Sequence, residues 1–118
     1  MLGAKTKVYI PNKAPHDFSS AEAFGELVFI TEGLLPNRYA ITTMYRVIVH
    51  ALRESKPDDW IVLCSLSSLC AILCSVFAVK HRRLNLLIHY NDTYKPKQLI
   101  FDSVEDVECS MSSLEQEE

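Results

Sequence analysis

Glycine is scarce in this sequence, which has three glycines in 118 residues, and no two of them are neighbours. The dinucleotide-binding fingerprint and the P-loop both require clustered glycines, because a backbone without side chains is needed to approach a phosphate closely. Neither motif is present in the chain. Nucleotide binding by either of these two routes is therefore excluded.

Signatures of catalysis and of metal binding are missing as well. No GxSxG motif places a serine at a strained elbow, and none of the four histidines has a partner at metal-ligand spacing. The four cysteines lack CxxC pairing, and three of them lie in an apolar stretch, which is typical of reduced, structural thiols. We therefore predict no metal, no cofactor and no catalytic residue.

The start of the chain lacks the apolar segment of a secretory signal. Residues 1–13 contain three lysines and no continuous run of large apolar side chains. Together with the reduced cysteines, this absence predicts a reducing, cytoplasmic setting for the protein.

Basic residues end at Lys97, whereas seven acidic residues follow it. Residues 103–118 are acidic, rich in serine and poor in large apolar side chains, so we expect a disordered tail after a folded domain of residues 1–102. Before residue 101 the chain has twelve basic and eight acidic side chains. That excess is smaller than the basic stripe of a nucleic-acid-binding protein, and nucleic acid is not an expected partner.

The longest apolar run, residues 61–79, has two interpretations. Its length, the tryptophan before it and the basic cluster after it are typical of a membrane-spanning helix. The serines at 65, 67 and 68 instead divide it into a strand, 60–64, and a capped helix, 68–81. An apolar strand at 84–90 then completes a βαβ unit. We favour the βαβ unit and keep a single span at 60–79 as the alternative.

Shorter patterns place the elements of the first half. Residues 5–10 alternate polar and apolar side chains and predict a strand that stops at Pro11. The spacing of a capping box predicts a short helix over 19–24, which Gly25 ends. A second strand is predicted at 27–31.

The remaining elements complete an α/β fold. A helix is predicted from Arg38 to Glu54, and Pro96 marks the last strand, 97–101, as an antiparallel edge. The expected architecture is a single small, Rossmann-like domain with a mostly parallel sheet of four or five strands and three helices, in the order β-α-β-α-β-α-β-β.

The two long helices differ in their apolar faces. The helix at 38–54 has one apolar stripe, formed by Ile41, Met44, Tyr45, Ile48, Ala51 and Leu52. The helix from Ser68 to His81 is apolar around most of its circumference, so we expect it to be buried on all sides. In so small a domain, such burial points to a central position or to self-association through this helix into a homo-oligomer.

A candidate ligand site follows from the parallel sheet, because ligands bind outside the carboxyl ends of its strands. The polar residues after the first and third strands meet there: Asn12, Lys13, His16, Asp17, Ser65, Ser67 and Ser68. Hydroxyls and free amides at a helix start attract anions, so the expected ligand is small and anionic or nucleotide-like. In the alternative explanation, the serines and Asp17 only cap helices.

Taken together, these features predict a small non-enzymatic binding or regulatory protein that self-associates. Accessory proteins of viruses and mobile elements are often of this kind, and we expect such a context. The first alternative is a small hydrolase or transferase that uses His16 and Asp17 on a phosphorylated substrate. The second alternative is the single-span membrane protein.

Overall fold

The computed structural model describes residues 6–13, 17–32, 40–63, 67–101, 108, 109 and 111. Its elements, in chain order, are β1 (Lys7–Lys13), the 3-10 helix η1 (Ser19–Phe24), β2 (Glu26–Glu32), α1 (Ile41–Ala51), β3 (Trp60–Val62), α2 (Ser67–His81), β4 (Arg83–Tyr90) and β5 (Thr93–Ile100).

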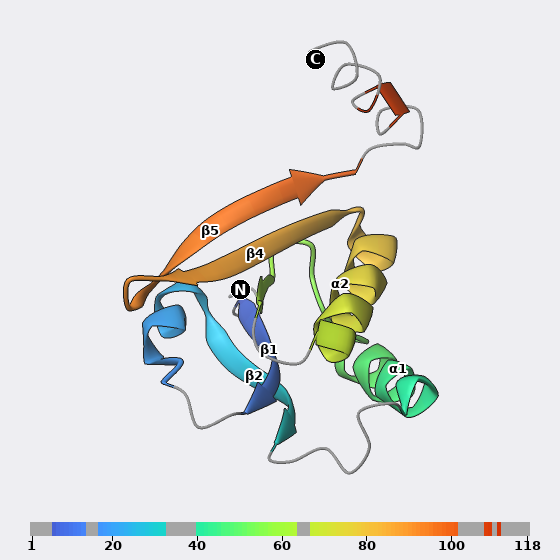
Figure 1. The fold of residues 1–118 in the computed structure, drawn as a ribbon, viewed down its shortest axis with the longest axis horizontal. Coiled ribbons are helices and arrows are strands. Elements are labelled where there is room, and N and C mark those ends of the chain that lie inside the picture. Colours follow the sequence, from blue (N-terminus) through green and yellow to red (C-terminus); the bar gives the residue numbers. More distant parts are fainter. Residues whose placement is uncertain are drawn as a thin grey trace, which may run out of the picture.

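The five strands form one sheet with the order β2-β1-β3-β4-β5 (Figure 1). The pairs β2–β1, β1–β3 and β3–β4 are parallel, and β5 runs antiparallel to β4. The predicted α/β domain with a mostly parallel sheet, about three helices and an antiparallel last edge is confirmed.

Helices cover both faces of the sheet, and β1 shows why. Val8 and Ile10 point to the face that η1 covers, whereas Tyr9 points to the face that α1 and α2 cover. All three side chains are almost completely buried. Strand β1 therefore contributes to two cores at once, and burial of each large apolar side chain stabilises the fold by about 1.5–3 kcal/mol.

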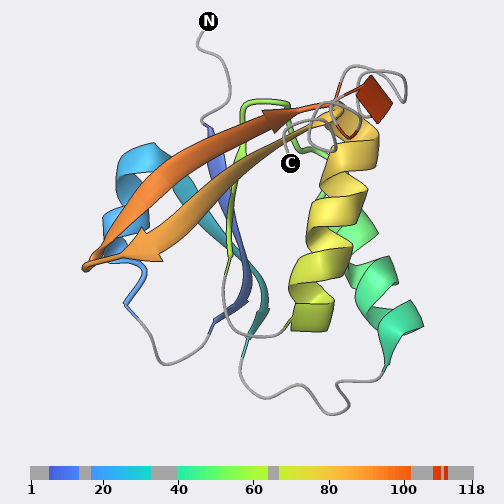
Figure 2. The same ribbon diagram turned by 45° about the horizontal axis from the view of Figure 1, so that its top comes forward.

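The core between the sheet and the long helices depends on α2. Leu69, Leu73 and Phe77 recur at every fourth position and are fully buried. They pack with Ile48 of α1 and with Leu52, which follows its last residue, and α1 lies beside α2 on the same face of the sheet (Figure 2). The second core, on the η1 face, includes two edge-to-face aromatic pairs, Phe18 with Phe29 and Phe24 with Trp60.

Burial on all sides of α2, as its sequence predicts, is not reached within one chain. Ala71, Ser75 and Val79 lie one helical turn apart on an exposed stripe, and Val79 is 83% exposed. The reason is geometric, because among the described elements α2 packs mainly on α1 and on β4 and β1 of the sheet. The buried stripe of α1 is also narrower than predicted, since Ile41 and Tyr45 are exposed.

Strand β1 does not stop at Pro11 as predicted, but continues to Lys13. The Glu26 N–H donates to the Thr6 carbonyl oxygen, so the backbone groups of even-numbered β1 residues face β2. By this alternation the Pro11 nitrogen faces away from β2. The missing donor therefore leaves the pairing of β1 with β2 intact.

The last strand is longer than predicted and includes Pro96. Asn91 and Asp92 both have positive φ angles, 48° and 63°, as a two-residue hairpin turn with the right-handed strand twist requires. Hydrogen-bonded and non-hydrogen-bonded pairs alternate along the hairpin, starting with the hydrogen-bonded pair of Tyr90 and Thr93. The pair of Leu87 and Pro96 is then non-hydrogen-bonded, so the Pro96 nitrogen points away from β4. A proline is tolerated there because this strand is an edge.

The capping box predicted for the first helix does not form. Helix η1 begins after Phe18 without a side-chain cap and is a 3-10 helix. Gly25 follows it with φ 157° and ψ −174°, and a Cβ at this position would lie 2.4 Å from the Thr6 carbonyl oxygen. Glycine is therefore required where η1 turns into β2.

The apolar run is divided as the favoured interpretation expects, with a strand at 60–62 and a helix at 67–81. The alternative of one continuous helix over 60–79 is therefore wrong. In the part of the chain that the structure describes, every helix is too short or too polar to cross a membrane. The helix predicted from Arg38 to Glu54 begins at Ile41 and ends at Ala51, where a turn over 52–54 follows.

Candidate ligand site at the carboxyl ends of the strands

The sheet has a topological switch point at β1. The chain passes from β1 to its neighbour on one side, β2, and then crosses to its neighbour on the other side, β3. In open α/β sheets, ligands bind outside the carboxyl ends of the two strands at such a point. Here that position is bounded by Asn12 and Lys13 on β1 and by Leu63 after β3, with α2 beginning at Ser67.

Pro11 limits the pairing of β1 and β3. Only two residue pairs join these strands, Val8 with Trp60 and Tyr9 with Ile61. The Pro11 nitrogen, which faces the β3 side, has no proton to donate, so pairing does not continue. On its other side, the chain after β3 stays paired with β4, since Leu63 donates its N–H to the Leu87 carbonyl oxygen at 3.2 Å. Among the described residues, no register pair beyond Tyr9 and Ile61 joins the two strands at the switch point.

The two predicted site residues on β1 make contacts with β2. The Thr31 hydroxyl lies 2.8 Å from Asn12 Oδ1 and 2.9 Å from the Pro11 carbonyl oxygen, and its single proton is shared between them. Lys13 is exposed, and its Nζ lies 5.3 Å from the centroid of the Phe29 ring. The backbone places both residues at the switch point, while their side chains lie toward the β2 side.

The other predicted residues are only partly described. Asp17 Oδ1 accepts the Ser19 N–H at 2.8 Å at the start of η1. Ser68 Oγ donates to Met44 Sδ at 3.9 Å, which links α2 to α1. Ser67 is the first residue of α2, and His16 and Ser65 lie outside the described residues. Asp17 and Ser68 thus have local structural contacts, and ligand binding by these residues stays a prediction.

Both signs of charge lie near the switch point, because Lys13 on β1 has Glu32 on β2 as its register partner. The first turn of α2 contains no acidic residue, and the helix is 15 residues long. The amino end of such a helix has a partial positive charge and backbone N–H groups without helical partners. The exposed ammonium group of Lys13 adds a full positive charge at the end of β1.

A buried polar cluster, which the sequence analysis missed, lies at the opposite ends of the strands. Asp59 is fully buried and accepts the N–H groups of Lys7 and Lys56 at 2.9 and 2.8 Å. Asn85, also fully buried, donates to the carbonyl oxygens of Pro57 and Asp59 at 2.6 and 2.8 Å. A lone amide within the apolar run LNLLIHY was the available signal. The cluster satisfies buried backbone groups, so its function is structural.

The carboxyl ends of α1 and α2 meet in a second cluster. Lys80 Nζ donates to the carbonyl oxygens of Leu52 and Arg53 at 2.7 and 3.0 Å, so it caps α1. Ser55 Oγ lies 2.7 Å from the same Leu52 oxygen and 2.8 Å from His81 Nε2. Burial and the positive charge of Lys80 lower the pKa of His81. Because the Ser55 hydroxyl donates to the Leu52 oxygen, it accepts from a His81 Nε2–H, and the neutral form of the imidazole is favoured by burial and by Lys80.

The remaining perturbed groups are held in their protonated forms. Burial, with the charges of Asp59 and Glu54, raises the pKa of Tyr9 to about 12. Its hydroxyl is buried and has no hydrogen-bond partner among the described residues. Burial and Cys70 raise the pKa of Cys74 to about 11. Neither group supplies a nucleophile or a base near neutral pH.

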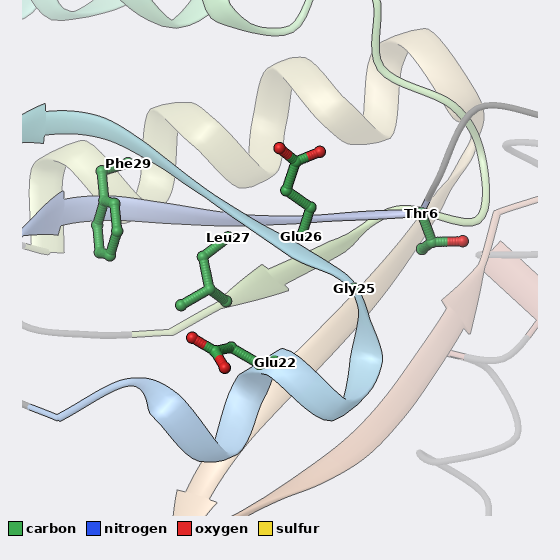
Figure 3. Close-up of a pocket in the computed structure, with 6 residues that line it drawn as sticks. All are labelled: Thr6, Glu22, Gly25, Glu26, Leu27 and Phe29. Carbon is green, nitrogen blue, oxygen red and sulfur yellow. The ribbon is translucent and has the colours of Figure 1, made fainter.

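A depression of about 700 Å³ opens at the start of β2 (Figure 3). It lies near the amino ends of β1 and β2, whereas the switch point lies at the carboxyl ends of the strands. Its lining residues are Thr6, Glu22, Gly25, Glu26, Leu27 and Phe29. The charged groups in it are carboxylates, which makes it unsuited to an anion. Among the described residues, no group of three histidine, cysteine or acidic side chains is arranged to hold a metal ion.

Comparison with known proteins gives one positive result. No curated protein and no solved structure matches the chain at a significant level. A family model described as "Phage Pam3 gp32-like protein" matches residues 6–102, which include every strand and helix named above. The viral context expected from the sequence agrees with this match, and the chain belongs to the phage Pam3 gp32-like protein family.

Proposed function

We propose that this phage-family protein is a non-enzymatic binding module that holds a small anionic ligand, of the size of a nucleotide or a phosphorylated metabolite, at the carboxyl ends of β1 and β3. The observation that carries the proposal is the switch point itself, where β1 separates β2 from β3 and pairing with β3 ends at Tyr9. Ligands of α/β sheets bind at this position in general.

The charges around the switch point support an anionic ligand. Lys13 ends β1 with an exposed ammonium group, and no acidic side chain opposes it in the first turn of α2. The amino end of a helix such as α2 has a partial positive charge that suits the oxygens of a phosphate or a carboxylate. The carboxylates of the described depression lie at the other end of the strands.

A binding role is preferred to catalysis because the described residues offer no activated group. The tyrosine and the thiol with raised pKa values are protonated at neutral pH, and His81 lies at the far end of α2 from the switch point. The hydrolase alternative depends on His16, and turnover that is lost in His16→Ala would favour it over the binding module.

A thermal-shift experiment on the full chain tests the ligand. The probes are inorganic phosphate, AMP, ATP and a sugar phosphate. A ligand at one hundred times its dissociation constant stabilises the folded state by about 2.7 kcal/mol, which raises Tm by several degrees in a domain of this size. We expect Lys13→Gln and the pair Ser67→Ala with Ser68→Ala to reduce that rise.

The matched control is Lys97→Gln, which removes an exposed lysine from β5. It should leave the ligand-induced rise in Tm unchanged. The ligand proposal fails if no probe raises Tm, or if Lys13→Gln and the serine variants respond to the probe as the unmodified protein does.

We also propose that two or more copies associate through α2. The exposed stripe of Ala71, Ser75 and Val79 supports this proposal, because its small side chains permit close packing with a second helix and Val79 is almost fully exposed. The half-buried Ile72 and Val76 lie beside the stripe and extend the apolar surface.

A further inference from the structure

The two edges of the sheet differ in how well they are protected. An edge strand presents unpaired N–H and C=O groups to which another chain can add. Strand β5 is guarded, because the Pro96 nitrogen points outward without a proton and the exposed Lys95 and Lys97 flank it. Strand β2, the opposite edge, has the sequence ELVFITE without proline or lysine.

The outer side of β2 has backbone groups that face away from the described strands. Because Glu26 directs its N–H at Thr6 of β1, the N–H and C=O groups of Leu27 and Phe29 point away from β1. No described strand lies on that side. Leu27 and Phe29 are only half-buried, and both line the depression of about 700 Å³.

The depression adds a charge preference to this edge. Glu22 and Glu26 are both exposed and line it together with the two apolar side chains. Figure 3 shows the Glu22 carboxylate on the η1 side of β2, next to Leu27, and Glu26 projecting from the other side of the strand. Successive side chains of an added strand point to these same two sides in turn.

We propose that β2 accepts an extended segment of a partner protein, which adds to the sheet as a sixth strand and has adjacent basic residues beside Glu22 and Glu26. Main-chain hydrogen bonds to Leu27 and Phe29 hold the segment. One basic side chain lies beside Glu22 and the next lies beside Glu26. This mode of recognition, strand addition at a sheet edge, takes its affinity from the backbone and its specificity from alternate side chains.

A second copy of the chain is a poorer occupant of this edge. Strand β2 begins and ends with glutamate, at positions 26 and 32. Antiparallel pairing of two copies centred on Phe29 would place each glutamate opposite one from the other copy. Directly opposed like charges destabilise such a pair, whereas a basic segment is attracted to the same edge.

Fluorescence anisotropy with a labelled peptide tests the proposal on the full chain. The probe is a short peptide of alternating valine and threonine with a pair of lysines at each end. The comparison peptides have glutamates in place of the lysines, or N-methyl groups on alternate backbone nitrogens of the lysine peptide. We expect only the unmethylated lysine peptide to bind, and to bind more weakly as salt is raised.

Protein variants assign the binding to this edge. Glu22→Gln combined with Glu26→Gln should weaken binding of the lysine peptide by about two- to thirtyfold, the range for losing two exposed ion pairs. Glu54→Gln, an exposed glutamate in the turn after α1, is the matched control and should change nothing.

Three results would overturn the proposal. The first is equal binding of the lysine and glutamate peptides. The second is equal binding of the methylated and unmethylated peptides, because strand addition requires the peptide N–H groups. The third is a stable dimer of the free protein that Glu26→Lys strengthens and the peptide does not dissociate, since a second copy would then occupy β2.

Discussion

The carboxylate of Asp59 accepts the backbone N–H of Lys7 at 2.9 Å, although 52 positions separate the two residues in the sequence. The same carboxylate accepts the Lys56 N–H, so one buried side chain joins the start of β1 to the turn before β3. This contact holds β1 to the segment before β3 at the amino ends of the two strands.

We predict that Asp59→Ala lowers the free energy of unfolding by about 2–4 kcal/mol, because two backbone N–H groups lose their acceptor. Urea denaturation monitored by circular dichroism measures the change. Asp58→Ala, at the exposed neighbouring position, is the control and should cost less than about 0.5 kcal/mol. Equal effects of the two substitutions would contradict this account of Asp59.

Gly25 is the second position where a small change has a large expected effect. A Cβ there would lie 2.4 Å from the Thr6 carbonyl oxygen, which also accepts the Glu26 N–H. Gly25→Ala should therefore lower the free energy of unfolding by about 2 kcal/mol or more, since backbone must move to make room. Ser20→Ala, on the exposed side of η1, is the control in the same urea experiment.

The stability of the fold should depend on pH through His81. Its pKa is lowered in the folded state by burial and by Lys80, against a smaller opposing effect of Asp59 and Asp58. The unfolded chain therefore takes up the proton first, so stability is complete above the unfolded pKa of about 6.5 and falls as pH drops below it. Urea midpoints at pH 7.5 and pH 5.5 measure this loss.

His81→Gln removes the titrating group and keeps an amide that can bond to Ser55 Oγ, which lies 2.8 Å from His81 Nε2. The variant should lose less stability between the two pH values than the unmodified protein. If both proteins lose the same amount, His81 is not the cause of the pH dependence.

Self-association through α2 predicts the effect of a charge at Val79. Val79→Glu should convert the assembly to single chains, because a carboxylate buried between helices lacks a partner. Size-exclusion chromatography with light scattering measures the mass. Val49→Glu, on the exposed side of α1, is the control and should leave the assembly intact. A protein that is monomeric before any substitution would refute the assembly.

The sequence predicted the architecture well because burial patterns are local and strong. The division of residues 60–81 into a strand and a helix was visible in the serine cluster, and the antiparallel edge followed from Pro96. Strand ends were predicted less well. Whether a proline stops a strand depends on which neighbour its nitrogen faces, and that is known for Pro11 only once the order β2-β1-β3 is known.

The polar residues were harder to interpret than the apolar ones. Asn85 donates to the carbonyl oxygen of Asp59, which is 26 positions away in the sequence, and no local sequence pattern predicts such a hydrogen bond. The depression was also missed, because Glu22 and Leu27 meet only after η1 turns at Gly25. The positions of the predicted site residues followed from where the strands end. Their contacts could not be predicted, because Asn12 bonds to Thr31 and Ser68 bonds to Met44, which are distant in the sequence.

The end of pairing at Tyr9 has a consequence for the sheet. Toward the carboxyl ends, β1 stays attached to β2, and the chain after β3 stays attached to β4. Among the described residues, no register pair beyond Tyr9 and Ile61 joins these two halves at that end. The nitrogen of a single proline in β1, which carries no proton, therefore cannot supply the main-chain bond that another residue would donate toward β3.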